Sequence, residues 1–462
     1  MDFKEDIVAI SSPNGMGAIA LIRITGEKAL EKVSKCFKSK NGKPLAKIKS
    51  HSIMFGEFMN QDVVVDEVII SFFDKGKSYT GQQTIEISCH GSTFIQKKII
   101  EILLDQNIRL AKPGEFTMRA FLNGKMDLTQ AEAVSDLIYS DSYSMHKIAL
   151  SQMRGGFQND LKILREELLH FVSMIELELD FSEEDVEFAN KSELEKLIKK
   201  VKEKVEKLKE SFKYGNAIKN GVPVAIAGKP NSGKSSLLNT LLNEQKAIVS
   251  DIPGTTRDAI EDVVIVDGIK YRFIDTAGLR KTNDIIESKG IEITKSKISE
   301  ASVLLYLFDI SDTNVQEIIN DLKEFDRQDL KIILIRNKVD LKNNSEIDLE
   351  KLLKKSSEFG IKEIIEISAI EKKSVETLIN KLSKIFQLIQ KSSDTVVTNM
   401  RHYESLSQAL ISLCEVEKGL ENDISGDLLS IDLRKAIDSI GEITGQITND
   451  ELLGNIFSNF CI

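Results

Sequence analysis

The sequence predicts a multidomain protein: an α+β domain, then an α-helical domain, with an α/β P-loop domain inserted into the helical one. A chain of 462 residues is too long for one hydrophobic core and suggests roughly two to four domains. The apolar pattern changes from strand-like alternation to helical spacing, then to short strands alternating with helices, and finally back to helical spacing. A glycine-rich phosphate-loop motif begins only at Gly228.

Residues 1–122 are predicted to form the α+β domain. The stretch TIEISC places Ile85, Ile87 and Cys89 on one face of a strand, with Thr84 and the other polar residues on the opposite face. Such alternation is typical of a strand with one face on a core and one face in water. The apolar runs IVAI and AIALIRI predict further strands of the same domain.

Residues 123–219 and 386–462 are predicted to form the two parts of the helical domain. Leu161, Leu164 and Leu168 recur at spacings of three and four, which places them on one face of a helix. The same spacing returns near the end of the chain. The pattern therefore predicts helices that pack on helices.

Residues 220–385 are predicted to form the inserted domain. The runs VPVAIAG, VLLYLFD and KIILIRN are short apolar strands separated by helical segments. This alternation is typical of a mostly parallel sheet covered by helices on both faces. Asp267 and Gly268 lie between two alternating runs and predict a hairpin turn, so one edge strand is expected to be antiparallel.

Composition excludes several classes of protein. The 62 basic and 72 acidic residues give a net charge of -10, which argues against a protein that coats nucleic acid but does not exclude a local basic patch. The four cysteines and five histidines show no metal-ligand or disulfide spacing. Charged residues follow Met1, and the longest apolar run, residues 303–308, is too short to cross a membrane. We expect a cytoplasmic protein without a membrane span.

The stretch GKPNSGKS, residues 228–235, matches a phosphate-binding loop between a strand and a helix. Gly228 and Gly233 let backbone N–H groups turn toward phosphates, and Lys234 supplies a charge to the β- and γ-phosphate oxygens. The Ser235 hydroxyl is a candidate Mg²⁺ ligand. A chance glycine turn explains the motif less well, because the required strand and helix flank it.

The stretch NKVD, residues 337–340, predicts which base is bound. The Asp340 carboxylate suits the N1–H and the exocyclic amine of guanine, whereas adenine presents an acceptor there. We therefore predict GTP. A solvated loop would explain NKVD alone, but DTAG, residues 275–278, lies between the two motifs in the expected order. In DTAG, the Asp275 carboxylate can hold the coordination shell of Mg²⁺, and the Gly278 N–H can contact the γ-phosphate.

The stretch SDIPGTTRD, residues 250–258, supplies candidate switch residues. Leu279 stands where Ras-like GTPases have a water-orienting glutamine, and no arginine finger is obvious, so a monovalent cation could supply the missing charge. The Asn231 oxygen is a candidate ligand, although the motif alone explains it equally well as a loop residue. The predicted GTP-binding residues are Gly228, Asn231, Ser232, Gly233, Lys234, Ser235, Ser236, Ser250, Asp251, Ile252, Pro253, Gly254, Thr255, Thr256, Asp275, Thr276, Ala277, Gly278, Asn337, Lys338, Asp340, Ser368 and Ala369.

These motifs, together with LIRITG, YTGQQTIEISCHGS, FLNGKMDLTQAEA and the final NFCI, resemble the MnmE (TrmE) family of tRNA modification GTPases, within the TrmE-Era-EngA-YihA-Septin-like group. The resemblance runs from Ile7 to Ile462. It implies an N-terminal domain that binds tetrahydrofolate and dimerises. It also implies a homodimer that works with the FAD protein MnmG. Together they would add a carboxymethylaminomethyl or aminomethyl group to the wobble uridine of tRNA.

The resemblance also implies roles for single residues. By position, K⁺ ligands fall on Asn231, Ser250, the Ile252 backbone and Thr255, and Mg²⁺ ligands on Ser235 and Thr256. Contacts to 5-formyltetrahydrofolate fall on Arg23, Glu86 and Lys125, which would otherwise be ordinary polar residues of strands and a turn. Candidate catalytic residues are Glu287, twelve positions after Asp275, and Cys461, whose chemical role the family leaves open. The sequence ends at Cys461-Ile462, without the Gly-Lys that follows in the family, so no folate contact from a terminal lysine is predicted.

Two functions fit the GTPase motifs. The first is the GTP-hydrolysing subunit of a tRNA modification enzyme, with hydrolysis stimulated by K⁺ through pairing of the GTP-binding domains. The alternative is a regulatory switch GTPase in ribosome assembly, whose first domain only docks RNA. A switch has no use for a folate pocket, so the N-terminal motifs favour the enzyme.

Overall fold

The computed structural model describes residues 5–180, 191–244, 262–266, 269–274, 298, 301–309, 314–327, 330–341, 348–390, 396–447, 450–458 and 460. The chain divides into two compact units, which are described separately. The first unit comprises Met1–Tyr139, Leu150–Leu169 and Ile437–Ile462, and the second comprises Ser140–Ala149 and His170–Ala436. An N-terminal domain, helical segments and a separate α/β sheet are all present, and the helical segments are divided between the two units.

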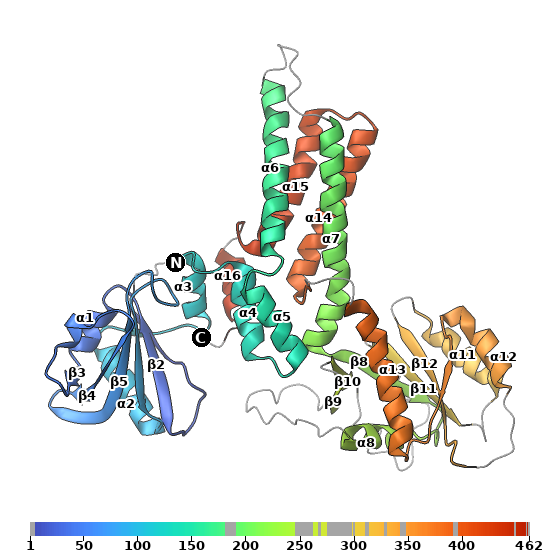
Figure 1. Cartoon of the computed structure of the whole chain (residues 1–462), viewed down its shortest axis with the longest axis horizontal. Coiled ribbons are helices and arrows are strands. Elements are labelled where there is room, and N and C mark those ends of the chain that lie inside the picture. The colour runs from blue at the N-terminus through green and yellow to red at the C-terminus, as the bar shows by residue number, and fades with distance from the viewer. Residues whose placement is uncertain are drawn as a thin grey trace. The chain divides into compact units, whose positions relative to one another are not determined.

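A seven-stranded sheet forms the N-terminal domain, with the strand order β3-β4-β5-β6-β2-β1-β7 (Figure 1). Its strands are β1 (Ile7–Ile10), β2 (Ile19–Thr25), β3 (Phe37–Ser39), β4 (Ser52–Asn60), β5 (Val63–Phe73), β6 (Thr84–His90) and β7 (Arg109–Leu110). Neighbouring strands are antiparallel except β1 and β7. The register pairs Arg23 on β2 with Glu86 on β6, so the sheet itself brings these two residues together.

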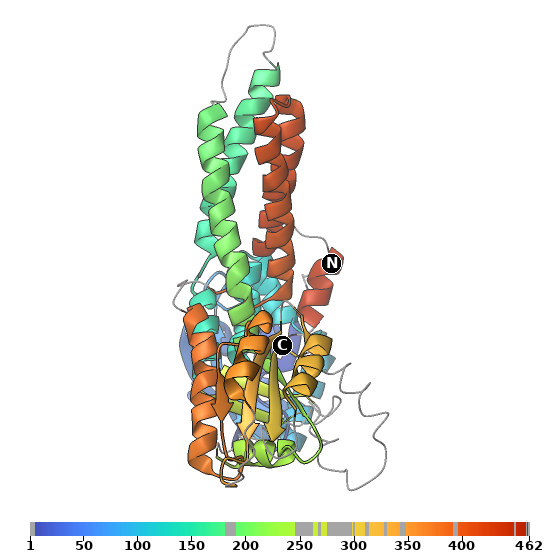
Figure 2. The same ribbon diagram turned by 90° about the vertical axis from the view of Figure 1, so that its right-hand side faces the viewer.

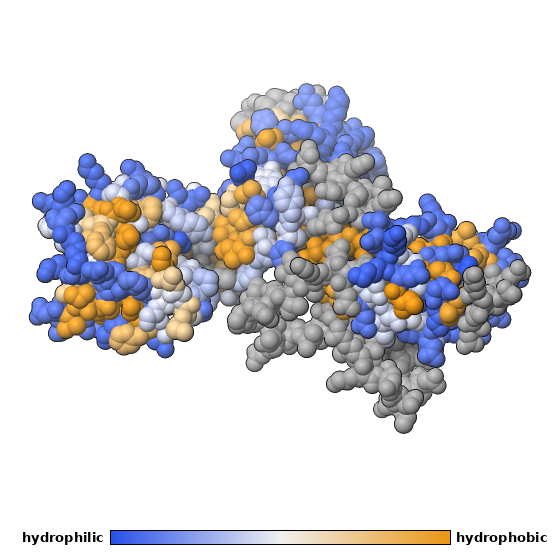
Figure 3. Space-filling model, turned by 60° about the horizontal axis from the view of Figure 1, so that its bottom comes forward, coloured by the Kyte–Doolittle hydropathy of each residue, from blue (hydrophilic) through white to orange (hydrophobic). Residues whose placement is uncertain are grey.

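One face of this sheet packs on helices α1 (Ala29–Ser34) and α2 (Thr93–Asp105). Ile85, Ile87 and Cys89 are buried in that core, as their alternation predicts. Thr84 lies on the opposite face, as predicted, but it is buried there, because its hydroxyl belongs to a polar cluster with Thr25. Along β4 and β5 the exposed face instead carries apolar side chains, among them Ile53, Phe55 and Ile69. Hydrophobic patches on the surface of this domain are visible in Figure 3.

Further helices complete the first unit. They are α3 (Glu115–Leu122), α4 (Leu128–Ile138), the last part of α5 (Tyr143–Met153), the first part of α6 (Gln158–Asp180), the end of α15 (Gly426–Thr444), and α16 (Asp450–Ser458). Asp127 caps α4 with a hydrogen bond from the Gln130 backbone, so a new helix begins directly after the Lys125 turn. Phe457 of α16 packs with Leu128 and Met118, which joins the end of the chain to the N-terminal domain.

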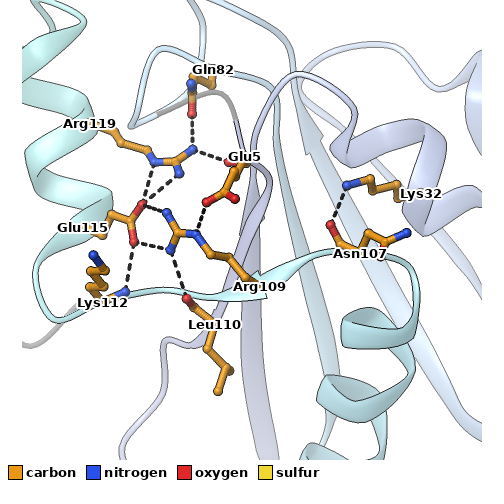
Figure 4. A network of polar contacts seen from close by, with 9 residues as sticks. All are labelled: Glu5, Lys32, Gln82, Asn107, Arg109, Leu110, Lys112, Glu115 and Arg119. Carbon is orange, nitrogen blue, oxygen red and sulfur yellow. Dashed lines mark hydrogen bonds and ion pairs between the residues drawn. The ribbon is translucent and has the colours of Figure 1, made fainter. Parts of the chain in front are cut away.

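A buried ion-pair network holds α3 against the sheet (Figure 4). Glu115 accepts two hydrogen bonds of 2.7 Å from Arg109 and lies 2.8 Å from Arg119, whose side chain is fully buried. Burial alone would raise the pKa of Glu115, but hydrogen bonds from Arg109, Lys112 N–H and Arg119 outweigh it and lower the pKa to about 2. The carboxylate is therefore charged in the folded chain and forms ion pairs with both guanidinium groups.

Replacing Glu115 by glutamine is expected to destabilise the N-terminal domain by about 3 kcal/mol, because buried Arg119 loses its counter-charge. The folded pKa lies below the ordinary value of 4.5, so in the wild type this stabilisation is present above about pH 4.5 and is lost as the pH falls toward 2. Hydrogen exchange in β1 and α3, corrected for intrinsic rates, measures both effects. The control Glu31→Gln removes an exposed pair with Lys35 and should change neither. Equal protection in both variants would contradict the role given to Glu115.

Two long helices lie side by side in the second unit, as both views show (Figures 1 and 2). They are α7 (Lys191–Asn220) and α14 (Met400–Glu421). Phe212 stacks on Tyr403 with ring centroids 4.7 Å apart, and Lys202 pairs with Glu417 at 2.8 Å. This packing of helix on helix agrees with the predicted apolar spacing.

The second sheet of the chain has six strands in the order β13-β12-β11-β8-β10-β9. They are β8 (Val222–Gly228), β9 (Asp262–Val266), β10 (Ile269–Phe273), β11 (Val303–Asp309), β12 (Lys331–Asn337) and β13 (Ile364–Glu366). All neighbours are parallel except β9 and β10, which confirms the predicted antiparallel edge; the hairpin residues 267–268 lie outside the described residues. The sheet has a core on each face. One includes α8 (Lys234–Glu244) and α13 (Lys372–Gln390), and the other includes α11 (Val315–Phe325) and α12 (Leu349–Ser356).

Within the described residues, no helix is long and apolar enough to cross a membrane, and no cluster of three acidic, histidine or cysteine side chains suits a metal ion. Cys36, Cys89 and Cys414 are free thiols. Burial raises the pKa of Cys89 to about 11, so this thiol stays protonated at neutral pH.

Candidate functional site

The phosphate-binding loop joins the end of β8 to the start of α8, as its motif predicts. Gly228 has a φ of 140° and Gly233 a φ of 95°, in the region that favours glycine. A Cβ on Gly228 would lie 2.0 Å from the Leu307 carbonyl oxygen, and a Cβ on Gly233 would lie 2.0 Å from Asn337 Nδ2. Both glycines are therefore needed for the close packing of this loop.

Lys234 lies over the phosphate-binding loop at the start of α8. Its Nζ donates hydrogen bonds of 2.7 Å to the carbonyl oxygens of Gly228 and Lys229. Burial lowers the pKa of Lys234, because the surroundings disfavour its charge. A phosphate group beside the ammonium would offset that cost, so the site suits an anion.

Asn337 joins the phosphate-binding loop to the loops of residues 337–340 and 368–369, which are the loops predicted to contact the base. Its Nδ2 donates to the Ser232 carbonyl oxygen at 2.7 Å, and its Oδ1 accepts from the Ala369 N–H at 2.9 Å. The side chain is buried, so removing it would leave the two backbone groups without these partners. Residues 228–235, 337–340 and 368–369 are thus brought together at the ends of three strands.

Some polar side chains of these three loops are exposed and others are buried. Asp340 is exposed just beyond β12, and Lys338 Nζ pairs with Asp309 at 2.7 Å. The hydroxyls of Ser232 and Ser368 are buried and have no hydrogen-bond partner in the described part of the chain. Buried hydroxyls of this kind fit a polar ligand between the loops.

Several predicted site residues lie outside the described residues, and their roles stay predictions. They are Ser250, Asp251, Ile252, Pro253, Gly254, Thr255, Thr256, Asp275, Thr276, Ala277, Gly278, Glu287 and Cys461. Asn231, Ser235 and Ser236 are described and lie on the phosphate-binding loop and the first turn of α8.

A second polar site lies on the N-terminal sheet. Arg23 Nε and Nη2 lie 2.9 and 2.8 Å from Glu86 Oε1. Arg23 Nη1 and Glu86 Oε2 make no hydrogen bond or ion pair with the residues that the structure describes, and both side chains are partly exposed. One donor and one acceptor therefore remain for a ligand on the open side of this pair.

Two aromatic rings contact the Arg23 guanidinium. Its Cζ lies 5.6 Å from the centre of the Tyr79 ring and 6.0 Å from that of Phe116. Lys125, the third predicted folate residue, bonds instead to the Gly76 carbonyl oxygen at 3.0 Å, on the loop that carries Tyr79. Sequence reasoning missed Tyr79. The available signal was an aromatic residue two positions before Gly81, in the segment that leads to the Glu86 strand.

A mostly parallel sheet with a phosphate-binding loop after β8 and a guanine-type NKVD loop after β12 defines the class of P-loop GTPases. The family follows from comparison with known proteins. Residues 6–125 match the model described as "GTP-binding protein TrmE N-terminus", and residues 128–461 match the model described as "MnmE helical domain". The chain belongs to the MnmE family.

Close relatives are similar along their whole length. The tRNA modification GTPase MnmE of Cytophaga hutchinsonii is 50% identical over 458 residues, which cover 99% of this chain and 97% of the relative. That of Flavobacterium psychrophilum is 50% identical over 467 residues, covering all of both chains. That of Bacteroides thetaiotaomicron is 49% identical over 464 residues, covering 99% of each.

Proposed function

We propose that this chain is the GTP-hydrolysing subunit of a complex that modifies the wobble uridine of tRNA at C5. The complex adds a carboxymethylaminomethyl or aminomethyl group, with a one-carbon unit from formyltetrahydrofolate, and its second subunit is the FAD protein MnmG. The protein works in the cytoplasm as a homodimer. The observation that carries the proposal is that one chain of the MnmE family holds both a guanine-type nucleotide site and the Arg23–Glu86 site.

The nucleotide site supports binding of GTP. The Lys234 ammonium supplies positive charge for the phosphates. The Asn337 side chain links the three loops by hydrogen bonds. Ser232 and Ser368 offer buried hydroxyls, and the exposed Asp340 carboxylate is placed to accept hydrogen bonds from guanine. These groups are held near strand ends or in the first turn of α8, so they are preorganised for GTP.

The cations have candidate ligands on the same loops. Mg²⁺ would be held by Ser235 and Thr256, and K⁺ by Asn231, Ser250, the Ile252 backbone and Thr255. Asn231 stands on the phosphate-binding loop with a φ of 61°, and Ser235 begins α8 beside Lys234. Bound there, the cations supply positive charge for the phosphoryl group that is transferred. Glu287 would orient the attacking water, as the family resemblance implies.

Hydrolysis is expected to depend on K⁺. No arginine finger is apparent, so the transition state needs charge from another source, and Leu279 replaces the glutamine that usually orients the attacking water. We expect GTP turnover about tenfold or more faster in KCl than in NaCl at equal ionic strength. The comparison is made on the same sample by phosphate release. Equal turnover in the two salts would contradict both the K⁺ site and the pairing of GTP-binding domains around it.

The N-terminal domain supports binding of a folate. The unpartnered Arg23 Nη1 donor and Glu86 Oε2 acceptor match the carbonyl and N–H groups along one edge of a pterin ring. Lys125 carries positive charge at the edge of the same region, where the anionic glutamyl tail would gain from it. The uncovered apolar face of β4 and β5 is a candidate surface for the homodimer. Cys461 remains a candidate catalytic residue from the family resemblance alone.

Titration of the full chain with 5-formyltetrahydrofolate, followed by calorimetry, tests the proposal. Saturable binding at one site per chain is expected for the modification enzyme. A chain that hydrolyses GTP but binds no folate would overturn the proposal and favour a switch GTPase.

A further inference from the structure

We propose that Tyr79 is a positioning residue of the folate site: its ring holds the Arg23 guanidinium in the orientation that presents the Arg23–Glu86 pair to the pterin. The inference deepens the proposed function and rests on it, because it concerns the ligand of the same site. It assigns a role to the loop of residues 74–83, which joins β5 to β6.

The geometry fixes Arg23 through two kinds of contact. Two of its nitrogens lie within 2.9 Å of Glu86 Oε1, and its Cζ lies 5.6 Å from the Tyr79 ring centre. A cation over an aromatic ring is attracted by the negative face of the ring. The ion pair alone leaves a partly exposed side chain able to turn about its long stem, whereas the Tyr79 ring, with the Phe116 ring 6.0 Å from Cζ, limits the arrangements open to it.

Tyr79 is itself held in place. Its hydroxyl shares a 3.0 Å hydrogen bond with the Thr117 hydroxyl of α3. The next residue, Thr80, belongs to a buried hydroxyl cluster in which its Oγ1 lies 2.7 Å from Thr25 Oγ1. Both neighbours belong to the packed N-terminal domain, so the ring has a fixed support.

Three side chains from α3 and the turn after it hold the loop of residues 74–83 in place through hydrogen bonds. Arg119 Nη1 donates to Gln82 Oε1 at 2.8 Å, and Asn123 Nδ2 donates to the Thr80 carbonyl oxygen at 2.7 Å. Lys125 Nζ donates to the Gly76 carbonyl oxygen at 3.0 Å. The Arg119 contact is part of the network in Figure 4. The loop is therefore preorganised, and preorganised contacts bind a ligand with less loss of conformational entropy.

Full-length variants at Tyr79 test the inference, with 5-formyltetrahydrofolate as the probe in calorimetry. Tyr79→Leu removes the aromatic face and is expected to raise the Kd about tenfold. Tyr79→Phe keeps the ring and loses only the hydrogen bond to Thr117, so its Kd should stay within about threefold of the wild-type value. Tyr79→Met is a second variant with a large side chain but no aromatic face, and its Kd should resemble that of Tyr79→Leu. The control Tyr143→Leu, at an exposed tyrosine of the second unit, should bind as wild type does.

The outcomes separate this inference from the proposed function. If wild type binds the folate and Arg23→Ala does not, but Tyr79→Leu and Tyr79→Met bind as wild type does, the positioning role is wrong and the folate site stands. A Tyr79→Phe variant as weak as Tyr79→Leu would also overturn the role of the ring. If wild type binds no folate, the proposed function fails and this inference fails with it. Hydrogen exchange in β6 checks that no variant has lost the sheet around Glu86.

Discussion

The Asp340→Asn variant is expected to bind GTP at least a hundredfold more weakly than the wild type and to gain affinity for xanthosine triphosphate. The Asp340 carboxylate offers two acceptors to the N1–H and the amine of guanine. An amide in its place turns an N–H donor toward the guanine amine, which is also a donor. Xanthine has a carbonyl where guanine has the amine, so the asparagine variant suits xanthine better. Competition against a fluorescent nucleotide measures both affinities.

The same domain offers a matched control for the Asp340→Asn substitution. Asp326 is an exposed aspartate of the same α/β domain, just after α11, and Asp326→Asn should leave both affinities unchanged. If Asp340→Asn and Asp326→Asn both bind GTP as the wild type does, the loop after β12 does not recognise the base. The assignment of guanine would then fail.

Replacing Lys234 by alanine is expected to slow GTP hydrolysis at least a hundredfold at saturating GTP and Mg²⁺. The Nζ group is fixed by two carbonyl oxygens at 2.7 Å, so its charge is preorganised for the phosphates. Loss of one such preorganised group typically costs about a hundredfold to a thousandfold in rate. Phosphate release in a single-turnover assay measures the chemical step.

The matched control for Lys234 is an exposed lysine of the same domain. Lys362→Ala removes equal charge away from the three loops and should hydrolyse GTP at the wild-type rate. A Lys234→Ala rate within threefold of the wild type would show that another group stabilises the phosphates. The nucleotide site described above would then be placed wrongly.

Local patterns predicted the strands and the loops of this protein well. The alternation in TIEISC predicted which residues of β6 are buried, because a strand has only two faces. The phosphate-binding loop was predictable because its glycines and its lysine act within one short turn. Thr84 lies on the predicted face of β6, but its burial was not predicted, since it depends on the Thr80 hydroxyl and on the Thr25 hydroxyl, which is distant in sequence.

Contacts between distant segments could not be predicted from local patterns. The Asn337 bridge requires three strand ends to meet, and only the strand order of the sheet brings them together. Glu115 and Arg119 are spaced like an exposed helix pair, yet they are buried because Arg109 approaches from a separate strand. Tyr79 stood inside a recognised motif, but its contact with Arg23 depends on the fold of the 74–83 loop.

Mass spectrometry of nucleosides from total tRNA tests the central claim most directly. It compares cells that lack this chain with the same cells after its return. We predict that carboxymethylaminomethyl or aminomethyl uridine disappears without the chain, that uridine or 2-thiouridine takes its place, and that the wild-type chain restores the modification. An unchanged nucleoside profile would contradict the proposed function and would favour a switch GTPase in ribosome assembly.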